Sequence, residues 1–345
     1  MFVHGIGGAR DPGAERDSWL AALAIGARKA GHLLEGSALA RNGFADAAFA
    51  YYGDLFLRPQ AQGSTTADVE AGEAEALRQL LEDLIDTHLQ ASPGEGERRI
   101  LRHARMELTA TQQPQGSGDF VRRLVNVCTT LLALPGVRRT GQWASGRLMA
   151  GHLAQVTRYL ARAEPDSGGR TLDERIRDRV LGFIDDGPTV VIAHSLGSVV
   201  ALEALHQHQG PIPLLVTVGS PLCMRTVVHP RLRPQPPVTP HCVERWLNYW
   251  DRDDIIAPRP WLERDVLPNA GGCLPVSDRV DSDGVWVHTA TKYLAQASVA
   301  GPVVEAIRRA RERSSARQPR DCFSSWRPRT RPWATWMSCR APPAS

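Results

Sequence analysis

The sequence predicts an α/β fold in which a mostly parallel sheet is flanked by helices. Residues 189–194 form a short β-branched run, and apolar residues recur at helical spacing over residues 199–205, so a buried strand leads into a helix. Residues 19–30 have the pattern of a helix between two strands, one at the start of the chain and one over residues 44–52. Such a β-α-β unit favours a parallel sheet.

The remaining elements follow from the same periodicities. Helices are predicted over residues 152–162, 172–183 and 302–313, and strands over residues 212–218 and 243–250. Between these core elements, helical spacing alone is found over residues 66–90, 120–134 and 141–148, with loops rich in Gly, Pro and Gln at 91–97 and 109–118. Because the residues beside them in the sequence are polar, we expect His152, His206 and His208 to lie at the surface.

These elements divide the chain into four expected parts. Residues 1–55 form the first part of an α/β core, and residues 151–307 form the rest of it. Residues 56–150 form a helical insertion, which is either a lid or cap over a site or a structural decoration. Residues 308–345 are rich in Arg, Pro, Ser and Trp, cannot bury a core, and are expected to be a disordered tail.

Composition excludes several classes of protein. The chain has 345 residues, of which 42% are hydrophobic, enough for a full core. Its net charge of +4 comes from the tail, where ten Arg oppose two acidic residues, so nucleic acid is not an expected partner. The six Cys show no C-x-x-C pair and no zinc spacing, so neither a metal nor a cofactor is expected. With no signal-peptide pattern, a cytoplasmic protein is expected.

The turn between the strand at 189–194 and the following helix carries the most informative motif. Ala-His-Ser-Leu-Gly over residues 193–197 puts Ser195 in a tight turn between small residues. This is the pattern of a nucleophile elbow, in which a strained turn exposes a serine hydroxyl. The alternative for a serine at a strand-to-helix turn is a helix N-cap.

A second turn follows the first strand of the chain. His4, Gly5 and Ile6, with two further glycines, enter a loop that completes neither of the phosphate-binding glycine motifs. Glycines in such a loop let N–H groups point at a developing negative charge, so we expect the N–H groups of Ile6 and Leu196 to form an oxyanion hole. His4 is expected to shape this loop through hydrogen bonds.

An acid and a histidine complete the candidate set. Asp251, Asp253 and Asp254 follow a late strand, and His288 lies just ahead of a predicted helix. A serine hydroxyl needs an imidazole to accept its proton, and a carboxylate orients that imidazole. The chain order Ser, Asp, His is one of the known orders of such triads, while the choice among the three Asp stays open.

On these motifs the chain resembles the α/β-hydrolase superfamily, in particular its lipase-like and esterase-like members. Their oxyanion loop reads His-Gly-x-Gly, as residues 4–7 do, and their elbow reads Gly/Ala-His-Ser-Leu-Gly, as residues 193–197 do. A further phrase, Asn-x-Tyr/Trp-x-x-x-Asp-x-Val-Ala, is approximated by residues 248–257 and implies that Asp254 is the acid. The chain departs from the family in lacking early strands and in having Ala193 where most elbows have glycine.

The resemblance implies a serine hydrolase that cleaves an ester through Ser195, Asp254 and His288 and an acyl-enzyme intermediate. The insertion and the apolar residues 124–134 favour a small-molecule substrate, an ester with a lipid-like or otherwise hydrophobic acyl group, and contact with a membrane surface is a further expectation. An amidase, a peptidase or a thioesterase would use the same residues. A non-catalytic binding protein of the same fold is the alternative from another class.

Overall fold

A single six-stranded sheet, in which all strands are parallel, forms the centre of the molecule. The computed structural model describes residues 1–7, 11–41, 43–57, 71–91, 93–109, 117–134, 145–252, 254, 256–257, 261–281 and 288–317. The strands lie in the order β2-β1-β3-β4-β5-β6. They are β1 (Phe2–Val3), β2 (Phe49–Ala50), β3 (Val190–His194), β4 (Leu214–Val218), β5 (Trp246–Trp250) and β6 (Pro275–Arg279).

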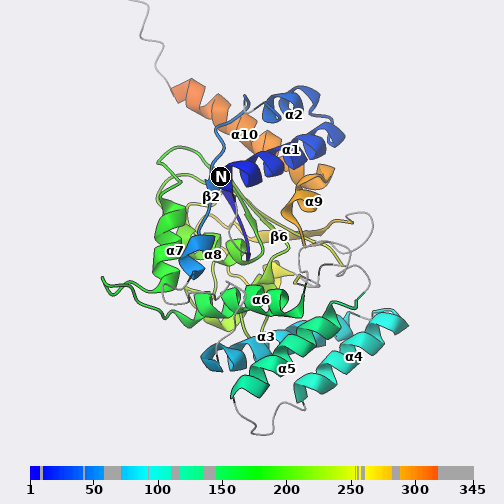
Figure 1. Cartoon of the computed structure of the whole chain (residues 1–345). Coiled ribbons are helices and arrows are strands. Elements are labelled where there is room, and N and C mark those ends of the chain that lie inside the picture. Colours follow the sequence, from blue (N-terminus) through cyan, green and yellow to red (C-terminus); the bar gives the residue numbers. More distant parts are fainter. Residues whose placement is uncertain are drawn as a thin grey trace, which may run out of the picture.

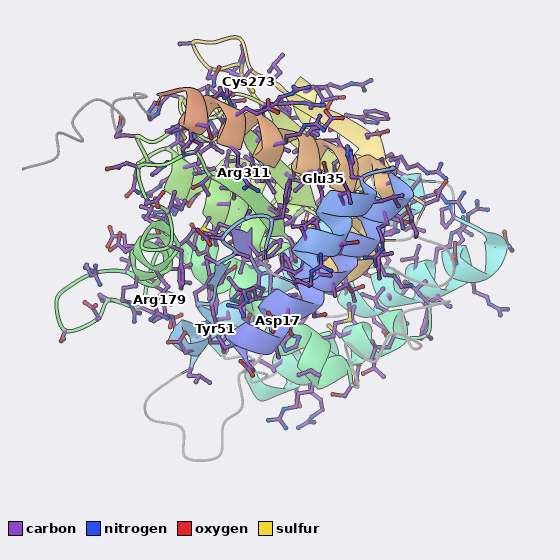
Figure 2. All side chains as sticks on the ribbon, turned by 90° about the horizontal axis from the view of Figure 1, so that it is seen from above. Asp17, Glu35, Tyr51, Arg179, Cys273 and Arg311 are labelled. Carbon is purple, nitrogen blue, oxygen red and sulfur yellow. The ribbon has the colours of Figure 1, made fainter. Side chains whose placement is uncertain are left out.

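Helices cover both faces of this sheet (Figure 1). One face carries α1 (Pro12–Lys29), α9 (Ala290–Leu294) and α10 (Ala297–Arg317), with α2 (Leu33–Leu39) beside α1. In the view from above, α1, α2 and α10 lie side by side, with Glu35 on α2 and Arg311 on α10 (Figure 2). The other face carries α6 (Gly146–Ala161), α7 (Leu172–Leu181) and α8 (Leu196–Leu205).

The alternation of side chains along the strands explains the two cores. Val190 and Ile192 of β3 belong to the cluster under α1 and α10, whereas Val191 and Ala193 belong to the cluster under α6 and α8. Successive residues of a strand point to opposite faces, so a strand covered on both sides must be apolar at every position. All five residues of β3 are buried, which agrees with its unbroken β-branched run.

A helical unit of α3 (Ala71–Gln90), α4 (Glu95–Thr109) and α5 (Ser117–Leu131) packs on α6, on the side away from the sheet (Figure 1). Its buried side chains, among them Leu77, Leu101 and Leu124, belong to the same apolar cluster as the elbow residue Leu196. The insertion therefore shares its core with the α/β unit.

Two boundaries and two elements differ from those expected. The boundary at residue 150 falls inside α6, which is one continuous helix where two were expected, and residues 149–160 of this helix are all buried. The loop expected over 91–97 ends at Glu95, where α4 begins. The strand β6 and the helix α4 were not anticipated at all.

The first part of the expected tail is also ordered. Residues 308–317 continue α10, whose Arg311 donates a 2.8 Å hydrogen bond to the carbonyl of Phe44 and lies over that ring. Arg313 pairs with Glu244 at 3.0 Å. Residues 318–345 lie outside the described residues.

Two of the three histidines expected at the surface are buried. His152 is 6% exposed and His208 is 8% exposed. Polar neighbours in the sequence do not determine exposure, because α6 and the chain after α8 are both covered by elements distant in sequence.

Candidate active site

The carboxyl ends of β1 and β3 meet where the order of the strands reverses. From β1 the chain goes to β2 on one side, and it later returns to β3 on the other side of β1. In open parallel sheets this reversal leaves a crevice at the carboxyl edge, where ligands bind. The loop that starts at His4 leaves β1 there, and Ser195 leaves β3 at the same point.

Ser195 has the strained backbone of an elbow. Its φ of 54° and ψ of −130° are unusual for a residue with a side chain. Hydrogen bonds hold this geometry on both sides, since the Ser195 N–H donates to Val218 O at 3.1 Å and the Ser198 Oγ–H donates to Ser195 O at 2.6 Å. At Gly197, a Cβ atom would lie 2.2 Å from His4 O, so only glycine lets β1 approach the elbow this closely.

Ser195, His288 and Asp254 form one line of hydrogen bonds. His288 Nε2 is 2.9 Å from Ser195 Oγ, and His288 Nδ1 is 2.9 Å from Asp254 Oδ1 and 3.0 Å from Oδ2. Because an ionised carboxylate can only accept, Nδ1 carries the proton and Nε2 is left to accept from the serine hydroxyl. The three side chains are at most 1% exposed. This arrangement can deprotonate the serine.

Asp254 is held by three donors. Besides His288, it accepts hydrogen bonds from the Ile256 N–H at 2.9 Å and from the Tyr293 hydroxyl at 2.7 Å. Gly219 lies against the pair with a φ of 54°, and a Cβ atom there would lie 2.8 Å from Asp254 Oδ2. Of the neighbouring acids, Asp251 donates its backbone N–H to the Tyr293 oxygen at 3.1 Å, and Asp253 lies outside the described residues.

The expected oxyanion loop lies directly against Ser195, the candidate nucleophile. A Cβ atom on Gly5 would be 2.5 Å from Ser195 Cβ and 3.1 Å from Ser195 Oγ. The buried Ile6 follows Gly5, and Leu196 is the first residue of α8, where an N–H has no acceptor within the helix. The N-terminus of α8 therefore presents an N–H group and a positive helix end beside Ser195.

Gln155 fixes the far side of this loop. Its side-chain oxygen accepts from the Gly7 N–H at 3.0 Å, and its amide nitrogen donates to Gly7 O at 3.1 Å. Gln155 lies on α6 and is 1% exposed. One buried amide thus satisfies both backbone groups of Gly7.

His4 is tied into the loop by both ring nitrogens. Its Nε2 accepts from the Tyr52 N–H at 3.1 Å, so Nδ1 carries the proton and donates to Gly5 O at 2.6 Å. The ring also stacks on the Tyr52 ring at a centroid distance of 4.1 Å. These contacts fit a residue that shapes the loop.

A second histidine ring contacts the site. The ring of His194 lies 4.7 Å from that of His288, centroid to centroid, and is also in edge-on contact with the ring of Trp19. The buried Tyr293 has a pKa raised well above its usual value, first by burial and then by the negative charge of Asp254. Its phenol therefore stays protonated and remains a donor to Asp254.

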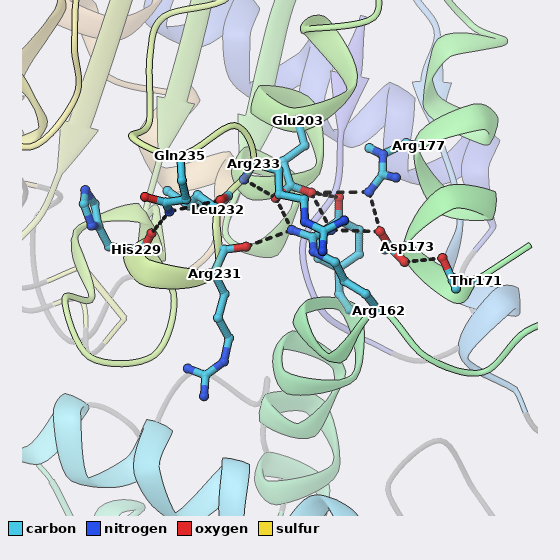
Figure 3. A network of polar contacts seen from close by, with 11 residues as sticks. Arg162, Thr171, Asp173, Arg177, Glu203, His229, Arg231, Leu232, Arg233 and Gln235 are labelled. Carbon is cyan, nitrogen blue, oxygen red and sulfur yellow. Dashed lines mark hydrogen bonds and ion pairs between the residues drawn. The ribbon is translucent and has the colours of Figure 1, made fainter.

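A buried network of charges holds the elbow helix from behind (Figure 3). Glu203 on α8 pairs with Arg162 at 2.6 Å and accepts from the Tyr159 hydroxyl at 2.8 Å. Asp173 pairs with the same Arg162 at 2.8 Å and with Arg177 at 2.6 Å. Burial alone would raise the pKa of Asp173, but hydrogen bonds from Thr171 and the two arginines outweigh it and lower that pKa. The network joins α6, α7 and α8.

A further cavity lies away from this site. It has a volume of about 740 Å³ and is lined by Phe2, Val190 and Ile192, together with residues of α1 and α10. Phe2 and Val190 begin their strands, so the cavity opens at the amino edge of the sheet, opposite Ser195.

Sequence reasoning missed four contributors to the site. Gln155 gave no signal, because it is a polar residue in a helix whose partner is distant in sequence. Gly219 and the Ser198–Ser220 contact, in which the two Oγ atoms are 2.6 Å apart, were also missed. Tyr293 follows His288 by five residues, but its contact with Asp254 had no sequence signal.

Within the part of the chain that the structure describes, no helix is both long and apolar enough to cross a membrane. In the same part, no three His, Cys, Asp or Glu side chains are grouped so that they could hold a metal ion. No family model, curated protein or solved structure matches the chain.

Proposed function

We propose that this chain is a serine hydrolase of the α/β-hydrolase type, which cleaves an ester through an acyl-enzyme intermediate. The observation that carries the proposal is the line of hydrogen bonds from Ser195 Oγ through His288 to Asp254. Nothing in packing requires a strained serine, an imidazole and a carboxylate in this order. The crevice position and the adjacent glycine loop support the same conclusion.

The reaction follows from the positions of the protons. His288 Nε2 takes the proton of Ser195 Oγ while the oxygen attacks the ester carbonyl, and Asp254 stabilises the resulting imidazolium. The carbonyl oxygen becomes negative and is stabilised by the N–H groups of Ile6 and Leu196. His288 then gives its proton to the leaving alkoxide, which leaves the acyl group on Ser195.

Deacylation repeats these steps with water. His288 takes a proton from the water that attacks the acyl carbon, and it returns that proton to Ser195 as the carboxylic acid departs. No cofactor or metal enters this scheme. The substrate is a small molecule, an ester with a hydrophobic acyl group, and the enzyme acts in the cytoplasm, with contact to a membrane surface as part of the proposal.

The hydrophobic substrate is supported by the apolar cluster that the insertion shares with the elbow. Leu196, Leu222 and Ile256 beside the site belong to the same cluster as the helices α3 to α5. Asp83 of α3 also accepts from the Thr226 N–H at 3.3 Å, so the insertion reaches the chain that follows β4. An insertion in this position can act as a lid over an acyl group.

Covalent labelling tests the proposed chemistry directly. A fluorophosphonate probe is expected to label the wild-type protein and Ser37→Ala, a control serine on α2, but not Ser195→Ala. We expect Asp254→Asn to slow ester hydrolysis by about 10³- to 10⁴-fold, the scale for a triad acid, and Asp251→Asn to change it little. A folded wild-type protein that resists the probe would refute the proposal.

A substrate series tests the chemical class. Nitrophenyl esters from acetate to palmitate, with matched anilides and thioesters, are compared by kcat/KM. We expect esters of medium or long acyl chains to be the best substrates. A preference for acetate would remove the hydrophobic substrate, and a preference for anilides or thioesters would replace the esterase.

A further inference from the structure

The phenol of Tyr293 contacts Asp254, the acid of the candidate triad. It donates a hydrogen bond of 2.7 Å to Asp254 Oδ2, while His288 Nδ1 lies 3.0 Å from the same oxygen. The imidazole and the phenol therefore compete for one carboxylate. Tyr293 is 0% exposed, so water cannot replace its hydroxyl.

The direction of the phenol proton is fixed by a second contact. The Tyr293 oxygen accepts the backbone N–H of Asp251 at 3.1 Å. Because that contact uses the oxygen as an acceptor, the phenol proton is left to point at Asp254. Burial and the nearby negative charge raise the pKa of this phenol, which keeps the proton on Tyr293 at every pH where the site would work.

We propose that Tyr293 is a positioning residue: its phenol holds Asp254 in place and draws negative charge away from His288, which keeps the imidazole a free base at lower pH. The inference rests on the proposed hydrolase function. A carboxylate with an extra donor is a weaker partner for an imidazolium, so His288 loses its proton more readily. The catalytic base would then be active over a wider range of mildly acidic pH.

Other titratable groups could affect the same equilibrium and are present in every variant below. Those with an interaction to His288, Asp254 or Tyr293, within the described ranges, come from the ends of β3 and β5 and from the turn after β4. They are His194, Asp251 and Cys223. The buried residues of α1 and α10 in the cluster around Tyr293 are apolar.

The test follows the rate of fluorophosphonate labelling against pH in the full chain, so it needs no natural substrate. Tyr293→Phe removes only the hydroxyl. We expect the acid limb of the profile to move to higher pH by about half a unit to one unit, and the plateau rate to fall about tenfold. The matched control is Tyr249→Phe, which removes a buried hydroxyl that donates to Ser298 O at 2.6 Å, away from Asp254. Its profile should equal that of the wild type.

A double-mutant comparison separates positioning from general destabilisation. If Tyr293 acts through Asp254, the change Tyr293→Phe should have no further effect on labelling in an Asp254→Asn background. Equal fractional losses in both backgrounds would overturn the inference. An acid limb that stays in place, or that moves to lower pH, would overturn it as well.

Replacing Tyr293 by 3-fluorotyrosine covers the case in which Tyr293→Phe does not fold. The fluorinated phenol is a stronger donor of nearly the same shape, so the acid limb should move to lower pH. No shift in this variant would count against the inference. If the wild-type protein itself is not labelled, it is the hydrolase function that fails, which distinguishes the two results.

Discussion

A methyl group at Gly5 would test whether the glycine loop serves the reaction. In Gly5→Ala the new Cβ atom would lie 2.5 Å from Ser195 Cβ, 3.0 Å from His194 O and 3.1 Å from Ser195 Oγ. Carbon atoms in contact normally stay about 3.5 to 4 Å apart, so the loop must retreat by about 1 Å. Ala is otherwise acceptable, because the backbone of Gly5 does not have the positive φ that excludes a side chain.

The size of the effect follows from that displacement. An oxyanion donor works when it lies about 2.7 to 3.1 Å from the charged oxygen, and losing one costs about 2.7 to 4 kcal/mol. A retreat of about 1 Å takes the N–H of Ile6 out of that range. We therefore expect kcat to fall by about 10²- to 10³-fold. KM should change little, because the lost contact is made in the transition state.

The assay compares ester hydrolysis by the wild type, Gly5→Ala and Gly96→Ala. Gly96 lies on α4, and a Cβ atom added there would meet no other part of the protein within 4 Å, so alanine should leave kcat unchanged. Thermal unfolding is followed alongside, since overpacking itself destabilises by about 1 to 3 kcal/mol. A folded Gly5→Ala protein with wild-type kcat would refute the role of this loop.

Three further predictions concern the surroundings of the site. Gln155→Leu leaves the N–H and C=O of Gly7 without the partners that Gln155 supplies, so we expect it to lower the free energy of unfolding by about 1 to 3 kcal/mol and to slow probe labelling. An unchanged labelling rate would contradict the role of Gln155. Ser198→Ala removes the side-chain donor to Ser195 O, so probe labelling should slow by about tenfold. Ser198→Thr keeps the hydroxyl and should label at close to the wild-type rate, and equal labelling rates for the wild type and both variants would contradict the role of this hydroxyl. Asp173→Asn should destabilise the protein at pH 7 but not at low pH. The folded-state pKa of Asp173 is depressed, so its contribution to stability is present above the usual pKa of 3.8 and is lost as the pH falls through the folded pKa. Urea unfolding that shows the same difference in stability between the two proteins at pH 7 and at pH 2.5 would contradict this.

Local patterns predicted the parts of the fold that are locally determined. The strand β3 and the helix α8 were found because an unbroken β-branched run and a helical period lie next to each other. The helix α4 was missed, since Arg and Glu make up nearly half of its sequence and only Leu101, Ala104 and Leu108 are buried. The strand β6 was missed because it is an edge strand with exposed Val276 and Asp278, whose pairing to β5 comes from the sheet.

The sequence by itself determined which residue types could make a hydrolytic site and the order in which the chain presents them. The residue pattern left three acids open and the family resemblance implied Asp254. The tertiary structure brings Asp254 to His288, because Asp251 and Asp254 are separated by a single turn and the choice depends on where β5 ends beside β4. Tertiary structure also supplied Gln155 and the phenol of Tyr293, whose contacts join segments up to 148 residues apart. Periodicity reports the local backbone, whereas a contact between distant segments depends on how the whole sheet and its helices pack.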